Sequence, residues 1–180
     1  MLNKLMLNKL RALLHDQSGM GIVEFALLVP LMLSMLLGGF EVTQVVGANL
    51  RVGVAAQTMA ELISQQTAVT TTSLANFCKG AQLVMTPFSS TPLKIAVASV
   101  TNNKNTNNVD WTYTTCGTAT AISNAAALAD PMIPNDGDSV VVVKASYSYA
   151  GVTHFVLSSG YSLTETSFAR PRNITQIALN

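Results

Sequence analysis

The longest hydrophobic stretch of the chain runs over residues 20–40 and contains a single formally charged residue, Glu24. An α-helix rises about 1.5 Å per residue, so this stretch would span roughly 30 Å, the thickness of one hydrocarbon core. Lysines and an arginine precede it in residues 1–19, and Glu41 follows it directly. This distribution predicts one transmembrane helix over residues 20–40, with its N-terminus in the cytoplasm and the rest of the chain on the other side.

A second apolar pattern follows residue 40 on the same predicted helix. Four aliphatic residues recur every four positions: Val42, Val46, Leu50 and Val54. Polar residues, among them Arg51, lie between them, so residues 41–68 predict an amphipathic continuation of the helix. The helix is expected to fray where β-branched threonines collect at residues 67–73.

Residues 69–180 predict a small domain with one further helix and a β-sheet. Ser73 is expected to cap a short helix that runs to Met85. Alternating apolar and polar positions predict strands at residues 93–100, 109–115, 139–150 and 161–172. The asparagine-rich run at residues 102–108 predicts a turn, and residues 117–138 form a connection rich in proline and alanine.

These elements together predict an α+β fold. Its long N-terminal helix, half transmembrane and half amphipathic, would pack against a small antiparallel sheet. In the second strand, Val109, Trp111 and Tyr113 are expected to share one face. In the third strand, alternate residues are expected to share a face, namely Val141, Val143, Ala145, Tyr147 and Tyr149.

The composition narrows the possible classes of protein. The chain has 180 residues, of which 49% are hydrophobic and 11% charged, and its mean hydropathy is +0.37. These values fit one membrane segment plus one modest domain. The net charge is +1 and no basic run is interleaved with aromatic residues, so nothing in the sequence indicates a nucleic-acid partner.

The single acid inside the apolar stretch requires a physical explanation. A carboxylate in a membrane helix costs roughly 2–3 kcal/mol at mid-depth and less near the edge. If the chain were cut after Gly19, Met20 would carry an ammonium group one helical turn from Glu24. Two unit charges about 4 Å apart attract by about 4 kcal/mol at an effective dielectric constant near 20. This pairing, within one chain or between neighbouring helices, would offset much of the cost of burying the acid.

A short motif marks the start of the apolar stretch, and it consists of Gly19, Met20, Glu24, Phe25 and Pro30. Following a basic leader, it resembles the processing region of type IV prepilins. It most closely resembles the TadE-like minor pilins, or pseudopilins, of tight-adherence (Tad) pilus systems. The two arginines that flank a proline at residues 170–172 also resemble the ending of TadE-like proteins.

The resemblance implies a pilin-like fold and a cleavage between Gly19 and Met20 by a prepilin peptidase. Glu24, Phe25 and Pro30 would then set the register of the helix in an assembly. The implied partners are other minor pilins or pseudopilins, the major pilin, and the platform of the assembly machine in the inner membrane. The implied location is the bacterial cytoplasmic membrane, with residues 1–19 as a cytoplasmic leader and residues 69–180 as a periplasmic domain.

Two other functions fit parts of the pattern. A pseudopilin of a type II secretion system shares the motif, although the early Pro30 and residues 170–172 argue against it. An uncleaved, signal-anchored periplasmic binding or sensor module would make Gly19 and Glu24 incidental. A conventional cleaved secretory signal is disfavoured, because the apolar core of such a signal spans about 7–15 residues.

The two cysteines, Cys78 and Cys116, fall on the side of the membrane predicted to be oxidising, where disulfides form. A bond between them would contribute roughly 3–4 kcal/mol in the chain-entropy model; the alternative is two buried thiols. His15 and His154 lack the sequence context of a catalytic nucleophile, and residues 135–138 fit a turn better than a calcium loop. The sequence thus predicts no enzyme, no cofactor and no metal site.

Overall fold

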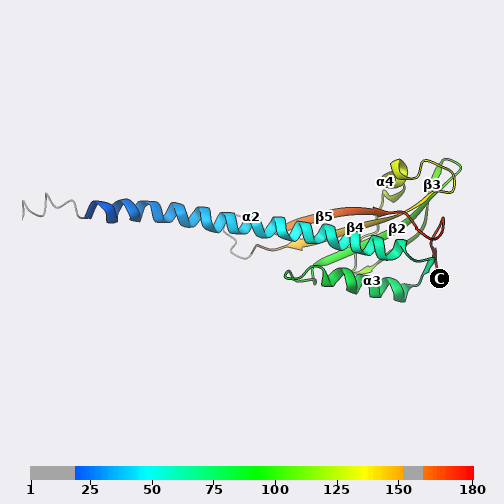
Figure 1. Ribbon diagram of the computed structural model, residues 1–180, viewed down its shortest axis with the longest axis horizontal. Coiled ribbons are helices and arrows are strands. Elements are labelled where there is room, and N and C mark those ends of the chain that lie inside the picture. The colour runs from blue at the N-terminus through cyan, green and yellow to red at the C-terminus, as the bar shows by residue number, and fades with distance from the viewer. Residues whose placement is uncertain (1–18, 152–159) are drawn as a thin grey trace, which may run out of the picture. The chain divides into compact units, whose positions relative to one another are not determined.

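The computed structural model describes residues 19–151 and 160–180 of the chain (Figure 1). The described residues leave out most of the predicted leader, residues 1–18, which includes His15. They also leave out His154. The chain divides into two compact units, Met1–Phe40 and Glu41–Asn180. One helix of 45 residues, α2 (Met20–Ser64), contributes to both units.

The second unit contains the remaining described elements. In chain order they are β1 (Ala68–Val69), α3 (Thr71–Leu83), β2 (Leu93–Asn103), β3 (Thr106–Cys116), α4 (Ala125–Ala129), the 3-10 helix η2 (Asp130–Met132), β4 (Ser139–Tyr149), β5 (Tyr161–Ala169) and β6 (Ala178–Leu179). Four strands form an antiparallel sheet in the order β3-β2-β4-β5, and β1 pairs in parallel with β6. The predicted α+β fold, a long N-terminal helix with a small antiparallel sheet, is confirmed.

Small residues form most of the buried face of α2 in the second unit. The buried apolar positions recur every three or four residues and are Ala48, Val52, Ala55, Ala56, Met59, Ala60 and Ile63. This spacing corresponds to one face of an α-helix. The alanines allow the helix backbone to approach the sheet closely. The more conspicuous aliphatic repeat from Val42 to Val54 is exposed instead of facing this core.

The ends of the two long helices differ from the prediction in detail. α2 ends at Ser64, whose carbonyl accepts a hydrogen bond of 3.0 Å from the backbone N–H of Arg172. This bond satisfies one of the carbonyl groups left open at a helix terminus. α3 is capped by Thr70, whose hydroxyl accepts from the N–H of Ser73 at 3.1 Å. The hydroxyl of Ser73 accepts from the N–H of Thr70 at 2.8 Å, so Ser73 completes a capping box and is not itself the cap.

The four-stranded sheet is covered on both faces. α2 and α3 lie on one side of it and α4 on the other (Figure 1). In β4, Val141 and Val143 pack into the core shared with α2 and α3, whereas Val140 and Val142 pack into the core shared with α4. Burial on both faces explains the unbroken run of valines at the start of β4. The proline- and alanine-rich connection over residues 117–138 therefore contains the short helix α4 and contributes to a second core.

The hairpin between β2 and β3 has a shorter turn than predicted. The strands include Asn103 and Thr106, so the expected turn over residues 102–108 shrinks to Lys104 and Asn105. Both residues have positive φ angles, of 51° and 63°. Two such residues give the backbone twist that matches a tight hairpin.

A β-bulge in β3 corrects the predicted face of Val109. Ser99 pairs with Trp111 and Val100 pairs with Val109, which leaves Asp110 as an extra residue. The alternation of side chains is therefore reset between Val109 and Trp111. Trp111 and Tyr113 are both buried in one core, but Val109 is 43% exposed.

Candidate functional site

The first unit presents an almost entirely apolar helix surface. The 18-residue window of highest hydropathy in α2 has a mean hydropathy of 2.2, and none of it is buried. Large apolar side chains are exposed along this segment, from Met20 and Ile22 to Leu36 and Phe40. Among the described residues, α2 is the one helix long and apolar enough to cross a membrane, by length and composition.

The predicted processing site lies at the start of this helix. Gly19 is the last residue before α2, Met20 is its first residue, and both are exposed. A Cβ added at Gly19 or Gly21 would meet no atom within 4 Å. The peptide bond between Gly19 and Met20 is therefore not packed against another described part of the chain.

Glu24 lies on the same side of α2 as Met20, because residues four apart on a helix are neighbours. The side chain of Glu24 is exposed. The Cβ atoms of such neighbours lie about 5–6 Å apart. A terminal ammonium group on Met20 would thus be within reach of the Glu24 carboxylate.

Phe25 and Pro30 lie further along the same exposed helix. Phe25 lines a shallow apolar groove with neighbouring side chains of the helix. α2 continues without interruption past Pro30, although proline lacks the N–H that would donate to the carbonyl of Ala26. Just beyond it, the hydroxyl of Ser34 donates to the carbonyl of Leu31 at 2.8 Å. All the residues of the predicted motif therefore lie at one uncovered end of α2.

The second unit carries an exposed apolar stripe on its own part of α2. We call it the outer stripe; its side chains are between 47% and 65% exposed, and its members are Val42, Val46, Leu50 and Val54. By helical geometry these positions lie on the side of α2 away from the buried alanines. Arg51, beside the stripe, donates from Nη1 to the carbonyl of Val84 at 3.4 Å. The stripe itself remains open among the described residues of this unit.

A comparison with protein families matches residues 19–61 to the family described as TadE-like protein. This helix is TadE-like. The match covers about a quarter of the chain and includes Gly19, Glu24, Pro30 and the outer stripe. The recognition made from the sequence motif is confirmed. Comparisons with curated proteins and with solved structures found no match.

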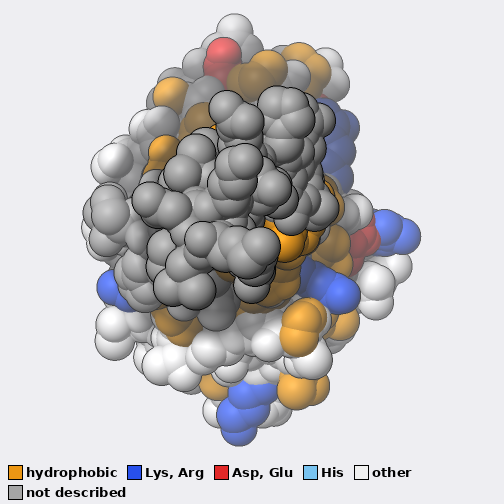
Figure 2. Space-filling model, turned by 90° about the vertical axis from the view of Figure 1, so that its left-hand side faces the viewer, with side chains coloured by type: hydrophobic (Ala, Val, Ile, Leu, Met, Phe, Trp, Pro, Cys, Tyr) orange, Lys and Arg blue, Asp and Glu red, His pale blue; other side chains and the backbone are white. Residues whose placement is uncertain are grey.

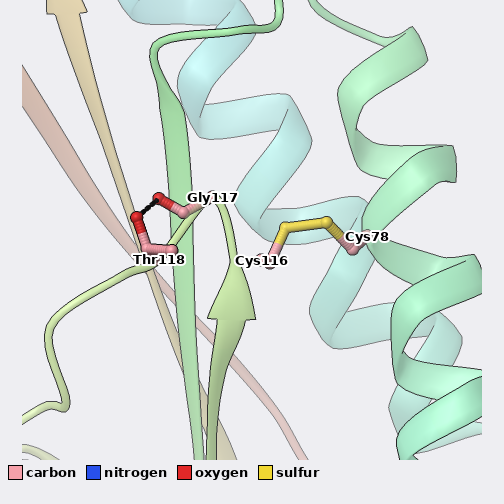
Figure 3. Close-up of a disulfide and its surroundings, with 4 residues drawn as sticks. All are labelled: Cys78, Cys116, Gly117 and Thr118. Atoms are coloured by element: carbon pink, nitrogen blue, oxygen red, sulfur yellow. Dashed lines mark hydrogen bonds between the residues drawn. A yellow bond between two sulfur atoms is a disulfide. The ribbon is translucent and has the colours of Figure 1, made fainter.

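A disulfide in the second unit joins Cys78 of α3 to Cys116, the last residue of β3 (Figure 3). The two Cα atoms are 5.8 Å apart, and both side chains are buried. Gly117 follows with a φ of +68°, and a Cβ added there would lie 2.2 Å from the carbonyl oxygen of Leu93. The bond therefore ties α3 to an edge strand, beside a position that requires glycine.

Arg170 and Arg172, on either side of Pro171, both contact other parts of the same chain. Arg172 forms an ion pair with Glu61, in the last turn of α2. Arg170 donates to the carbonyl of Met132 and lies 3.8 Å from the carboxylate of Asp138. These contacts join residues 32 to 111 positions apart along the chain, beyond the reach of any local pattern.

The tyrosines at the end of β4 are packed in the core and are not exposed on the surface. Tyr147 and Tyr149 are buried, and the ring of Phe88 meets that of Tyr149 edge-on with 6.5 Å between centroids. Burial raises the pKa of Tyr113, Tyr147 and Tyr149 above 10.0, and the negative charge of Glu41 raises that of Tyr149 further. The Tyr149 hydroxyl is buried without a hydrogen-bond partner among the described residues.

The described part of the chain shows neither a cluster of metal ligands nor, on the face in Figure 2, a basic patch. Within it, no three His, Cys, Asp or Glu side chains are grouped to bind a metal ion. Residues 135–138 form a turn in which the Asp138 carboxylate accepts from the backbone and side chain of Asn135. On the face shown in Figure 2, Lys and Arg side chains lie at separate places rather than in one patch.

Proposed function

We propose that this protein is a minor pilin or pseudopilin that acts in the assembly of a Tad-type pilus or secretion apparatus, and that it is not an enzyme. The observation that carries the proposal is the TadE-like helix, whose first part is apolar and uncovered within its own unit. An apolar helix of this length needs lipid or other helices around it. We place it in the bacterial cytoplasmic membrane, with its sheet domain in the periplasm.

The first step in this proposal is hydrolysis of the peptide bond between Gly19 and Met20 by a prepilin peptidase. Water adds across the bond, so Gly19 keeps a carboxylate on the released leader and Met20 gains an ammonium group. That charge appears one turn from Glu24. An attraction of about 4 kcal/mol at an effective dielectric constant near 20 would offset much of the roughly 2–3 kcal/mol cost of the acid in lipid.

Assembly would then bring apolar helices together. The cleaved subunit would join other minor pilins or pseudopilins and the major pilin, on the platform of the assembly machine. Glu24 would pair with the Met20 ammonium of its own chain or of a neighbour, which sets the register of one helix against the next. Phe25 and Pro30 would shape the contact surface.

The outer stripe extends this proposed contact beyond the apolar segment. Fully burying an aliphatic side chain contributes about 1.5–3 kcal/mol, so covering four half-exposed ones would contribute roughly 3–6 kcal/mol. Leu50→Asp should therefore impair assembly while leaving the fold intact, because the Leu50 side chain is 65% exposed. Thr164→Asp, at an exposed position on β5, is the matched control and should assemble normally.

The deciding experiment is N-terminal sequencing of the protein from native membranes, with and without the host's prepilin peptidase gene. The proposal expects Met20 at the N-terminus and a loss of about 2 kDa from the 19.0-kDa chain when the peptidase is present. Glu24→Gln should be cleaved yet assemble poorly. An N-terminus at Met1 or Met6 in the presence of the peptidase would instead support the uncleaved, signal-anchored module.

A further inference from the structure

We infer that Gly21 is a positioning residue for cleavage of the bond between Gly19 and Met20, because it keeps the first turn of α2 easy to unwind. The inference rests on the proposed processing after Gly19. It concerns the rate of that step, which neither the motif nor the family match addresses.

The bond to be cut lies at the boundary of a helix. Gly19 sits in a 3-10 turn and Met20 is the first residue of α2. At the start of a helix the carbonyl groups accept hydrogen bonds from N–H groups further along, whereas the first N–H groups have no intrahelical partner. A peptidase that must surround the bond therefore needs these carbonyl groups released. When opening is fast relative to cutting, the rate of proteolysis follows the population of the opened form. The stability of the first turn should therefore control the rate of cleavage.

The residues of this first turn make it weak. Gly21 disfavours helix more than any residue except proline, and the β-branched Ile22 and Val23 follow it. No acidic residue lies in the first turn to interact favourably with the helix dipole. Helix termini are also the parts of a fold that open at the lowest free-energy cost.

Packing does not explain the glycine at this position. A Cβ at Gly21 would meet no atom within 4 Å, so alanine fits there without a clash. The effect of Gly21 within the chain is on the helix–coil balance. Replacing it with alanine should lower the opened population about five-fold, which corresponds to about 1 kcal/mol of helix propensity.

Gly39 provides a matched control on the same helix. It is also helical, and a Cβ there would likewise meet no atom within 4 Å. Gly39→Ala raises helix propensity by a similar amount but far from the bond. It should leave the cleavage rate unchanged.

A third variant separates helix propensity from side-chain size. Valine is larger than alanine but a poorer helix former. If first-turn stability controls the rate, cleavage falls from Gly21 through Gly21→Val to Gly21→Ala. If the side chain instead clashes with the peptidase, Gly21→Val is the slowest of the three.

The experiment follows loss of the leader from the full-length chain over time, in native membranes that contain the host peptidase. The inference expects about a five-fold slower rate for Gly21→Ala, an intermediate rate for Gly21→Val, and a wild-type rate for Gly39→Ala. Equal rates for Gly21→Ala and wild type would overturn it, as would a slower rate for Gly21→Val than for Gly21→Ala. A wild-type chain that is never cut would defeat the proposed function itself, which is a different outcome.

Discussion

Removing the disulfide tests how the second unit is held together. The perturbation is the double substitution Cys78→Ala and Cys116→Ala, which deletes the link between α3 and the end of β3. The cysteines are separated by 38 residues. In the chain-entropy model a closed loop of this length lowers the entropy of the unfolded chain by about 13 cal/mol/K, or about 4 kcal/mol at 25 °C.

A loss of this size should be easy to measure. Domains of ordinary size have unfolding free energies of about 5–15 kcal/mol, and each 1 kcal/mol shifts the midpoint of a domain of 150–250 residues by roughly 2–4 °C. We expect the double variant to unfold about 8–16 °C below wild type. Trp111 is the single tryptophan of the chain, and its Nε1 donates to the carbonyl of Ile177 at 2.8 Å inside this unit. Its fluorescence in detergent-solubilised full-length protein therefore reports the transition.

The control is wild-type protein unfolded with a reductant present. Once the bond is reduced, its midpoint should approach that of the double variant, whose own midpoint should not respond to reductant. A difference below about 1 kcal/mol between oxidised wild type and the double variant would refute the reasoning. It would mean that the loop is already constrained in the unfolded chain or that the bond does not form.

Three further predictions concern glycines and tyrosines of the second unit. Gly117→Ala should destabilise the second unit by several kcal/mol, because a Cβ would lie 2.2 Å from the Leu93 carbonyl oxygen; Gly137→Ala, at a φ of +83° with open space around it, should cost about 1–2 kcal/mol in the same unfolding assay. Tyr149→Phe should raise the free energy of unfolding by about 1 kcal/mol in denaturant unfolding, because it removes a buried hydroxyl without a partner; a loss of stability would show that the hydroxyl is hydrogen-bonded. Because burial raises the pKa of Tyr113, Tyr147 and Tyr149 in the fold, their contribution is complete below pH 10 and should be lost as pH rises through the raised pKa values; alkaline titration of phenolate absorbance should show ionisation together with unfolding.

Local patterns in the sequence were enough to predict the main elements of the fold. The apolar stretch that begins at Met20 is long enough to indicate a membrane helix, and the run that ends at Tyr149 alternates with the period of a β-strand. The motif around Glu24 also lies in one short segment, so no knowledge of tertiary structure was needed to find it.

Features that depend on distant contacts were not predictable in the same way. The buried face of α2 is built from alanines such as Ala48 and Ala55, which do not stand out against the larger valines of the outer stripe. The bulge at Asp110 reverses the face of Val109, and no local signal announces it. The ion pair of Arg172 with Glu61 likewise depends on geometry that arises when the chain folds. The capping box of Thr70 and Ser73 is instead a local pattern, in which the prediction chose the wrong one of the two residues as the cap.

The attachment at the end of α2 has a consequence for the order of folding. The carbonyl of Ser64 and the strand β1 are held by residues 172–180, which emerge more than a hundred residues later. Contacts so far apart in sequence carry a loop-closure cost and form late. Until residues 172–180 have been synthesised, the end of α2 lacks the hydrogen bond to Ser64, and β1 lacks its partner strand. In a partly synthesised chain the end of α2 would therefore be less stable.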